Sequence, residues 1–254
     1  MKVTILGSGT STGVPQIGCQ CPVCTSTDIH DKRLRASAWI EVNNTHILID
    51  CGPDFREQML HQPFTHIDGV LLTHEHYDHT GGLDDLRPFC AFGDIPIYAN
   101  HQTVHDIRNR MPYCFLENKY PGVPLITVEE VKPHIPFHIK EVEILPLQIM
   151  HGTLPILGYR IGKLVYITDL KTLPENEWQY LEGVDCLIVN ALRKEPHLSH
   201  QTLDDALDMA DKIGAKETYL IHMSHHIGLH EKVSQELPPH VHLTYDGMSF
   251  LCED

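Results

Sequence analysis

The chain has 254 residues, of which 42% are hydrophobic and 21% are charged, proportions typical of a folded globular protein. Its formal net charge of −15 argues against a protein that tracks a long nucleic acid, because such a protein presents a basic face to the phosphates. No segment approaches the roughly 20 apolar residues of a membrane span, so we expect a cytoplasmic protein with no membrane partner, folded as one domain over residues 1–254.

Strand signals are short and recur along the whole chain. Residues 1–7 hold no long apolar stretch, so they predict a first strand and not a signal peptide. Asn43-Asn44 and Asp246-Gly247 are typical of hairpin turns. Apolar runs predict strands at Val3–Leu6, Trp39–Val42, His46–Ile49, Gly69–Leu72, Ile95–Tyr98, Val142–Ile149, Leu164–Ile167, Cys186–Val189, Thr218–Ile221, Val241–Tyr245 and Ser249–Leu251.

Helical signals lie between these strands. In the last helical segment, apolar residues recur at helical spacing and form one stripe, and Thr202 followed by Asp205 supplies an amino-terminal cap. Hairpin-like strands in both halves, with helices between them, predict an α/β fold of two mixed sheets covered by helices on the outside. The predicted helices are Pro53–His61, Asn100–Met111, Pro174–Leu181 and Thr202–Ile213.

Three glycines, Gly7, Gly9 and Gly13, follow the first strand in a spacing that could suggest a dinucleotide-binding loop. That loop must open directly into a helix, whereas Val14-Pro15 and a cysteine cluster follow here. We therefore exclude a dinucleotide loop, and we expect the glycines to let this segment run close to the active-site edge.

The cysteine cluster has the spacing Cys19-x-Cys21-x-x-Cys24. Three thiols this close together, in a chain with no sign of secretion, indicate a metal site and not disulfides. A structural zinc ion takes four ligands, so a fourth must come from elsewhere in the chain. We expect His225 to supply it, with His226 as the second choice.

Residues 74–79 (HEHYDH) are the most informative segment of the chain, because they place His74, His76, Asp78 and His79 within six positions. They follow the apolar run 69–72, which predicts a loop at the carboxyl end of a buried strand, where open α/β sheets carry their chemistry. In extended chain, His74 and His76 point to the same side, and a turn can bring Asp78 and His79 towards a neighbouring point. Such a cluster suits two metal ions better than one.

Three later polar residues each close an apolar strand: His151, Asp169 and His222. Alone, each would be an ordinary strand-end residue. Because the carboxyl ends of strands in such sheets gather at one edge, we expect all three to approach residues 74–79.

The pattern His-x-His-x-Asp-His over residues 74–79 resembles the metallo-β-lactamase superfamily. The resemblance implies a four-layer αββα sandwich with metals at the edge where the two sheets meet. It also assigns Asp50, which closes the strand His46–Ile49, to bracing the histidine loop. It places one metal ion on His74, His76 and His151 and a second on Asp78, His79 and His222, with Asp169 bridging the two.

This ligand set favours zinc, with manganese second, because imidazole and carboxylate groups suit both. His76 stands where di-iron flavoprotein relatives carry glutamate, so hydrolysis is favoured over redox chemistry. Two metal ions acidify a shared water molecule and stabilise the charge that builds on the attacked group. With the structural zinc added, we expect about three metal ions per chain.

The cysteine loop, the dinuclear set, a His-x-x-His after the last ligand strand and a closing Asp-Gly-Met (246–248) together resemble the PhnP-like cyclic phosphodiesterases. In that subgroup a histidine just before a late helix assists catalysis. His200 fits this description, with His197 as a nearby alternative.

The resemblance implies a hydrolase that opens a small cyclic phosphodiester, such as a ribose cyclic phosphate or a 2′,3′-cyclic nucleotide. Asp78 and Asp169 would hold the metals and orient the nucleophile, and His200 would stabilise or protonate the departing oxygen. Residues 108–136 are expected to wall the pocket, with Tyr113, Phe115 and Tyr120 as candidates to stack on a sugar or base.

Three rival functions stay open on sequence grounds. A transfer-RNA 3′-processing nuclease of the same superfamily would need a protruding basic arm, and no basic insertion is visible. A thioester hydrolase has similar ligands but lacks the cysteine loop. An accessory or carrier protein resembling that of pyrroloquinoline quinone assembly shares the cysteine loop, but it has no need of a complete dinuclear set. A homodimer is also open.

Overall fold

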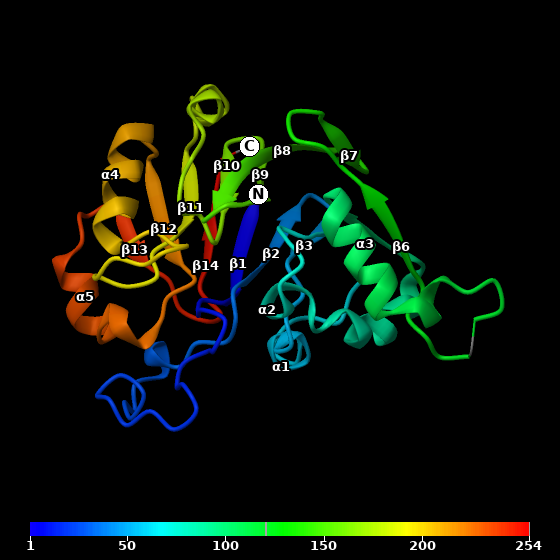
Figure 1. Cartoon of the computed structure of the whole chain (residues 1–254), viewed down its shortest axis with the longest axis horizontal. Coiled ribbons are helices and arrows are strands. Elements are labelled where there is room, and N and C mark those ends of the chain that lie inside the picture. The colour runs from blue at the N-terminus through cyan, green and yellow to red at the C-terminus, as the bar shows by residue number, and fades with distance from the viewer. Residues whose placement is uncertain (120, 254) are drawn as a thin grey trace.

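The computed structural model of the protein describes residues 1–119 and 121–253, and its strands form two seven-stranded sheets (Figure 1). The first sheet has the order β14–β1–β2–β3–β4–β5–β6 and the second has the order β13–β12–β11–β10–β9–β8–β7. The strands of the first sheet are β14 (Ser249–Leu251), β1 (Lys2–Gly7), β2 (Ser37–Val42), β3 (Thr45–Ile49), β4 (Gly69–Leu71), β5 (Ile95–Ala99) and β6 (Ile126–Glu130). Those of the second are β13 (Val241–Leu243), β12 (Glu217–Ile221), β11 (Cys186–Asn190), β10 (Leu164–Ile167), β9 (Leu154–Ile161), β8 (Val142–His151) and β7 (Phe137–Ile139).

Helices cover the outer face of each sheet, with α1 and α3 on the first and α4 and α5 on the second (Figure 1). No helix among the described residues is long and apolar enough to cross a membrane. The α-helices are α1 (Phe55–Met59), α2 (Tyr77–Thr80), α3 (His101–Arg110), α4 (Leu203–Ile213) and α5 (His230–Glu236). The 3₁₀ segments are η1 (Ile29–Asp31), η2 (Leu83–Phe92), η3 (Pro112–Phe115), η4 (Glu175–Leu181) and η5 (His225–Ile227).

The four-layer αββα arrangement predicted from the sequence is confirmed, and strand alternation explains it. In β3, Ile47 and Ile49 lie in the core between the two sheets, whereas Leu48 points to the opposite face and packs under the helices of the first sheet. In α4, the predicted apolar stripe is buried against the second sheet, and Thr202 and Asp205 form a reciprocal capping box. The alternating side chains of one strand therefore contribute to two cores, one between the sheets and one under the helices.

Each sheet combines antiparallel hairpins with a parallel half. Strands β3 to β6 run parallel in the first sheet, and β10 to β13 run parallel in the second. The carboxyl ends of parallel strands lie at the same edge of a sheet. The residues that follow β3, β4, β10 and β12 therefore gather at one edge of the sandwich.

Several local expectations need correction. The turn at Asp246-Gly247 is not a hairpin, because β13 belongs to the second sheet and β14 to the first, so the turn carries the chain across the sandwich. Residues 175–181 form a 3₁₀ helix instead of an α-helix. The sequence did not signal β6, β7 or β9; β7 has only three residues, and β9 contains Pro155 and Gly158, which both disfavour strands in isolation.

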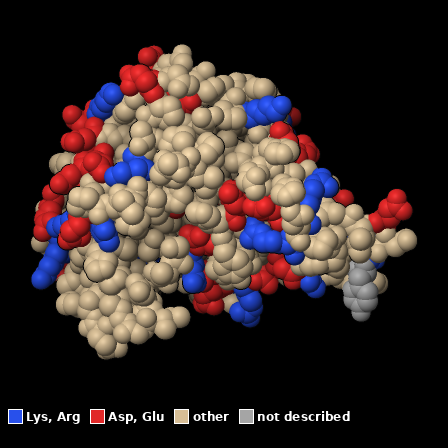
Figure 2. Space-filling model, viewed as in Figure 1, with Lys and Arg blue, Asp and Glu red and all other residues tan. Residues whose placement is uncertain are grey.

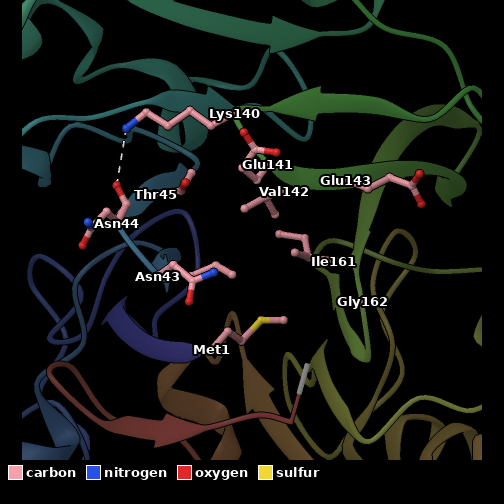
Figure 3. Close-up of a pocket in the computed structure, with 11 residues that line it drawn as sticks. Met1, Asn43, Asn44, Thr45, Lys140, Glu141, Val142, Glu143, Ile161 and Gly162 are labelled. Atoms are coloured by element: carbon pink, nitrogen blue, oxygen red, sulfur yellow. Dashed lines mark hydrogen bonds between the residues drawn. The ribbon is translucent and has the colours of Figure 1, made fainter.

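The two sheets are joined directly near the edge that carries the strand-end ligands. The Leu157 main-chain N–H of β9 donates to the Thr73 carbonyl at 2.9 Å, and the buried Tyr159 hydroxyl donates to the Leu72 carbonyl at 2.6 Å. At the opposite end, a cavity of about 640 Å³ lies among hairpin turns of the two sheets, including those at 43–45 and 140–143 (Figure 3). The sandwich is thus held together at its ligand-bearing edge and is more open at the other.

Substitutions at two buried tyrosines test the contact between the sheets that Tyr159 makes. Tyr159 and Tyr166 face each other across β9 and β10, but the Tyr166 hydroxyl has no partner among the described residues. We expect Tyr159→Phe to lower the free energy of unfolding by about 1–3 kcal/mol, because it leaves the Leu72 carbonyl unpaired. The matched variant Tyr166→Phe should be neutral or slightly stabilising. Urea denaturation measures both, and equal losses would contradict a special role for the Tyr159 contact.

Candidate metal centre

The loop after β4 is shaped by a short helix. His76 has extended backbone and stands just before α2, so the chain turns sharply after it. The Thr80 hydroxyl donates to the His76 carbonyl at 2.9 Å and closes this turn. The turn brings His79 back towards His74 and places Asp78 beside His79.

Glycines allow this loop to lie directly against the chain that follows β3. The Cys51 N–H donates to the His79 carbonyl at 2.8 Å, and the Gly82 N–H donates to the Cys51 carbonyl at 2.9 Å. A Cβ atom on Gly82 would collide with the Gly52 carbonyl oxygen, and one on Gly52 would collide with the Asp78 carbonyl oxygen. Only glycine fits at these two close approaches.

One group of three histidines lies at this edge. Potential ligand nitrogens of His74, His76 and His151 lie within 4.8 Å of one another. His151 comes from the end of β8, and its Nδ1–H faces the carbonyl oxygens of Asp169 and Ser199 at 2.9 and 3.0 Å. Because Nδ1 is the donor, Nε2 keeps its lone pair for a metal ion.

A second group surrounds the carboxylate of Asp169. One oxygen, Oδ1, lies 3.2 Å from His222 Nε2, and the other, Oδ2, lies 3.3 Å from His79 Nε2. Asp78 Oδ2 is 3.2 Å from the same nitrogen of His79. Asp169 also shares a possible ligand group with His74 and His79, so its carboxylate lies between the two proposed metal positions.

Asp50 fixes His79 from behind. This fully buried carboxylate accepts the His79 Nδ1–H at 2.7 Å and the Thr73 main-chain N–H at 2.8 Å. Burial lowers the pKa of His79. The nearby carboxylates of Asp169, Asp50 and Asp78 together have a larger, opposite effect, so the pKa lies well above its ordinary value. The site therefore attracts positive charge, which either a proton or a metal cation can supply.

Unpartnered nitrogens show that the residues fit metal ions. Among the described residues, His74 Nε2, His79 Nε2 and both ring nitrogens of His222 are buried without a hydrogen-bond partner. Leaving such groups unpaired in a protein interior is costly. Divalent cations at the two groups would pair them, since neutral imidazole is a common ligand of zinc and manganese.

His200 adjoins this centre and His197 lies behind it. His200 Nε2 is 2.9 Å from Asp169 Oδ1, and its ring stacks on that of His222 with centroids 5.1 Å apart. Its Nδ1 is 3.1 Å from His197 Nδ1. Burial lowers the pKa of His200 to about 4, although its hydrogen bond to Asp169 opposes this. Of the two candidates, His200 is the one in contact with the centre.

The cysteine cluster assembles as a separate site. Potential ligand atoms of Cys19, Cys21, Cys24 and His225 lie within 4.8 Å of one another, with Cys21 Sγ 3.2 Å from His225 Nδ1. Hydrogen bonds from the Cys24 N–H and from His225 help to lower the pKa of Cys21 to about 6, which favours the thiolate that binds metals. His226 stacks on His225 but is not part of this group.

The other expectations for this region concern the glycine-rich loop and three aromatic residues, and they have different outcomes. The glycine-rich loop does run along the site edge, because Ser8 accepts a hydrogen bond from the N–H of Met223, next to His222. The Tyr113 hydroxyl donates to Asp84 at 2.7 Å and Arg108 lies over the Phe115 ring, so both aromatics are engaged in packing. Tyr120 lies outside the described residues. No sequence pattern indicated Thr73 or the Ser199 carbonyl, which orient Asp50 and His151.

Metal content tests the ligand sets as a whole. Protein purified without chelator should hold about three divalent ions per chain, two at the histidine and aspartate groups and one at the cysteines. Elemental analysis measures this number. A content of one metal ion or none would contradict the proposed ligand sets.

Two variants separate the sites. Cys21→Ser should remove one metal ion and lower the melting temperature, because a structural zinc contributes folding free energy and only a small apolar cluster surrounds this loop. Asp169→Ala should instead remove the other two ions. Cys90→Ser is the matched control, since Cys90 is a similarly half-buried thiol outside both sites. Loss of the same ions in both test variants would mean that the sites are not independent.

Comparison with known proteins places this centre in context. Residues 45–223 match a family model described as a beta-lactamase superfamily domain. A structure of a new diphosphatase from the PhnP family is 38% identical, covers 99% of this chain and 98% of that chain, and has a TM-score of 0.92. The short form of human tRNase Z covers 99% of both chains with a TM-score of 0.74 at 19% identity, a likeness of fold.

Curated relatives extend the comparison. An octanoyltransferase of Porphyromonas gingivalis is 48% identical over 100% of this chain and 52% of its own length, so the chain spans about half of that relative. A coenzyme PQQ synthesis protein B of Rhodopseudomonas palustris is 32% identical over 54% of this chain, and the match again covers about half of the relative, 48% of its length. The family match covers most of the chain and includes the histidine-rich loop and the strand-end ligands; the chain therefore belongs to the beta-lactamase superfamily and has its metallo-β-lactamase fold.

Proposed function

We propose that the chain is a metal-dependent phosphodiesterase that hydrolyses small cyclic phosphodiesters at two divalent ions, with a further zinc ion on the cysteine cluster. The observation that carries this proposal is the set of unpartnered, buried imidazole nitrogens around the shared carboxylate of Asp169. When bound, two such ions supply Lewis acidity and lower the pKa of a water molecule. Zinc is the favoured metal and manganese the second.

The residues of the chain divide the remaining work. Asp78 and Asp169 would hold the ions and orient the attacking water. Their Oδ2 atoms lie 3.2 and 3.3 Å from the same imidazole nitrogen of His79, so both carboxylates face one point. His200 stands beside them with Nε2 facing the centre and Nδ1 facing His197. From this position, its N–H can be directed at the oxygen that leaves phosphorus and can stabilise the charge on that oxygen through a hydrogen bond.

The charge of the surface favours a small substrate. On the face that Figure 2 presents, Lys and Arg are interspersed with Asp and Glu and form no continuous basic stripe. A net charge of −15 repels a polyanion with many phosphates, whereas one phosphodiester meets mainly the local field of the metal ions. Residues 108–136, the segment expected to wall the pocket, hold four Lys or Arg against three Glu and so form no strongly basic arm.

The relatives support phosphorus as the attacked atom. The diphosphatase from the PhnP family matches nearly the whole chain at 38% identity, which makes hydrolysis of a small diphosphate the second candidate function. The accessory or carrier function left open by the sequence is disfavoured, because a carrier needs no complete set of ligands for two ions. The name octanoyltransferase belongs to a relative about twice as long, and we assign no acyl transfer to the shared half.

Substrate comparison tests the proposal. The metal-loaded protein should cleave 2′,3′-cyclic AMP and bis(p-nitrophenyl) phosphate, and should act little on precursor transfer RNA, whose many phosphates meet an acidic surface. Release of nucleotide, p-nitrophenolate or a 3′ trailer is measured in each case. Preference for a nucleoside diphosphate would favour the second candidate, and efficient cleavage of the RNA would overturn the proposal.

The role of His200 is tested by leaving-group dependence. His200→Ala should slow a substrate with an alkoxide leaving group by about 10²–10³-fold, because that oxygen needs a hydrogen-bond donor as charge builds on it. Hydrolysis of a p-nitrophenyl ester should fall far less, since p-nitrophenolate leaves without one. His240→Ala, at an exposed histidine, is the matched control. Equal losses on both substrates would leave His200 as a binding residue only.

A further inference from the structure

A second cavity, of about 430 Å³, lies at the same edge of the sandwich as the metal centre. Its walls come from three places: the start of α3 after β5, residues 130–133 at the end of β6, and residues 154–157 at the start of β9, with Gln148 of β8 beside them. A volume in the range of about 300–1,000 Å³ is typical of small-molecule sites. None of the proposed metal ligands lines it.

Two of the three walls of this cavity are tied to the metal centre. Leu154 pairs directly with His151 across the β8–β9 hairpin. Leu157 binds the Thr73 carbonyl, one residue before His74. The first turn of α3 reaches the histidine loop through Thr103, whose hydroxyl donates to Glu75 at 3.4 Å. A molecule that reacts at the metal centre therefore has this cavity next to it.

The walls are suited to an uncharged ring. Leu154, Pro155 and Pro133 provide a largely apolar surface, and the buried side chains of Val131, Ile156 and Leu157 lie behind it. The Gln148 side-chain amide also lines the cavity and makes no hydrogen bond within 1–119 and 121–253, so both its donor and its acceptor are available to a ligand. His101 and Glu130 are paired with each other at 2.9 Å. Lys132 also lines the cavity, but its side chain is exposed to solvent.

We propose that this cavity is the subsite for the substituent of the phosphodiester, and that it takes a heteroaromatic ring such as a nucleobase. The inference rests on the proposed function and specifies its substrate class: nucleoside cyclic phosphates are preferred over cyclic phosphates without a base. Apolar contact with Leu154 and Pro155 holds the ring, and Gln148 binds its polar edge.

Gln148 allows a sharp test, because its side chain is exposed to the cavity and belongs to no metal group. The two probes are 2′,3′-cyclic AMP and glycerol 1,2-cyclic phosphate, which share the reacting ring but differ in the base. Gln148→Trp should fill the cavity and lower kcat/KM for cyclic AMP by at least about tenfold, mainly through KM. Hydrolysis of the glycerol ester should stay within about twofold of wild type.

Gln148→Ala should produce a smaller rise in KM for cyclic AMP alone, because it removes the amide and leaves the apolar wall. Gln235→Trp, at an exposed glutamine of α5, is the matched control and should change neither substrate. Equal changes on both substrates, or none on either, would overturn the subsite and leave the proposed function standing. If the wild-type protein cleaved neither cyclic phosphate, the proposed function would fail and the subsite with it.

Discussion

The buried carboxylate of Asp50 holds the ring of His79 and the main chain of Thr73 at the same time, and the geometry of the metal centre depends on this double contact. It links the end of β3 to the loop after β4. Because it receives the Nδ1–H of His79, it leaves Nε2 directed at the carboxylates of Asp78 and Asp169. Burying a carboxylate raises its pKa, and its hydrogen bonds to Thr73 and His79 offset that cost.

The strand ends around this contact are conformationally strained. Asp50, Asp169 and His222 each follow a strand, and each has a positive φ, of 60°, 57° and 59° respectively. Residues other than glycine avoid this conformation, at a cost of about 1 kcal/mol or more each. The surrounding sheets maintain it, and the sharp turn re-aims each side chain from its strand into the site. The same edge that carries the strain is the one where Leu157 and Tyr159 join the two sheets.

The molecule also separates its two kinds of metal site by their surroundings. The histidine and aspartate groups lie at the edge where the two sheets meet, next to two large buried apolar cores that hold the strand ends in place. The cysteine loop has only a small apolar cluster of its own, and η5 carries His225 to it from just beyond β12. One strand end therefore serves both sites, with His222 facing the first and His225 facing the second.

The sequence by itself determined the fold class and the candidate ligands. Apolar runs closed by single polar residues marked β3, β4, β10 and β12, because a buried parallel strand must be apolar and its carboxyl end is where a polar side chain can enter a site. The spacing within residues 74–79 and within the cysteine loop indicated metal sites, because metal ligands that lie close together in the sequence can be recognised from their spacing.

Only the tertiary structure decided what depends on long-range contacts. It chose His225 over His226 and brought His200 into contact with Asp169, because those choices depend on loops meeting across more than 30 positions of sequence. It placed Asp246-Gly247 between two sheets instead of within a hairpin, and it formed β9 despite Pro155 and Gly158. Local propensity cannot indicate these outcomes, since the pairing with β8 and β10 stabilises β9 from both sides.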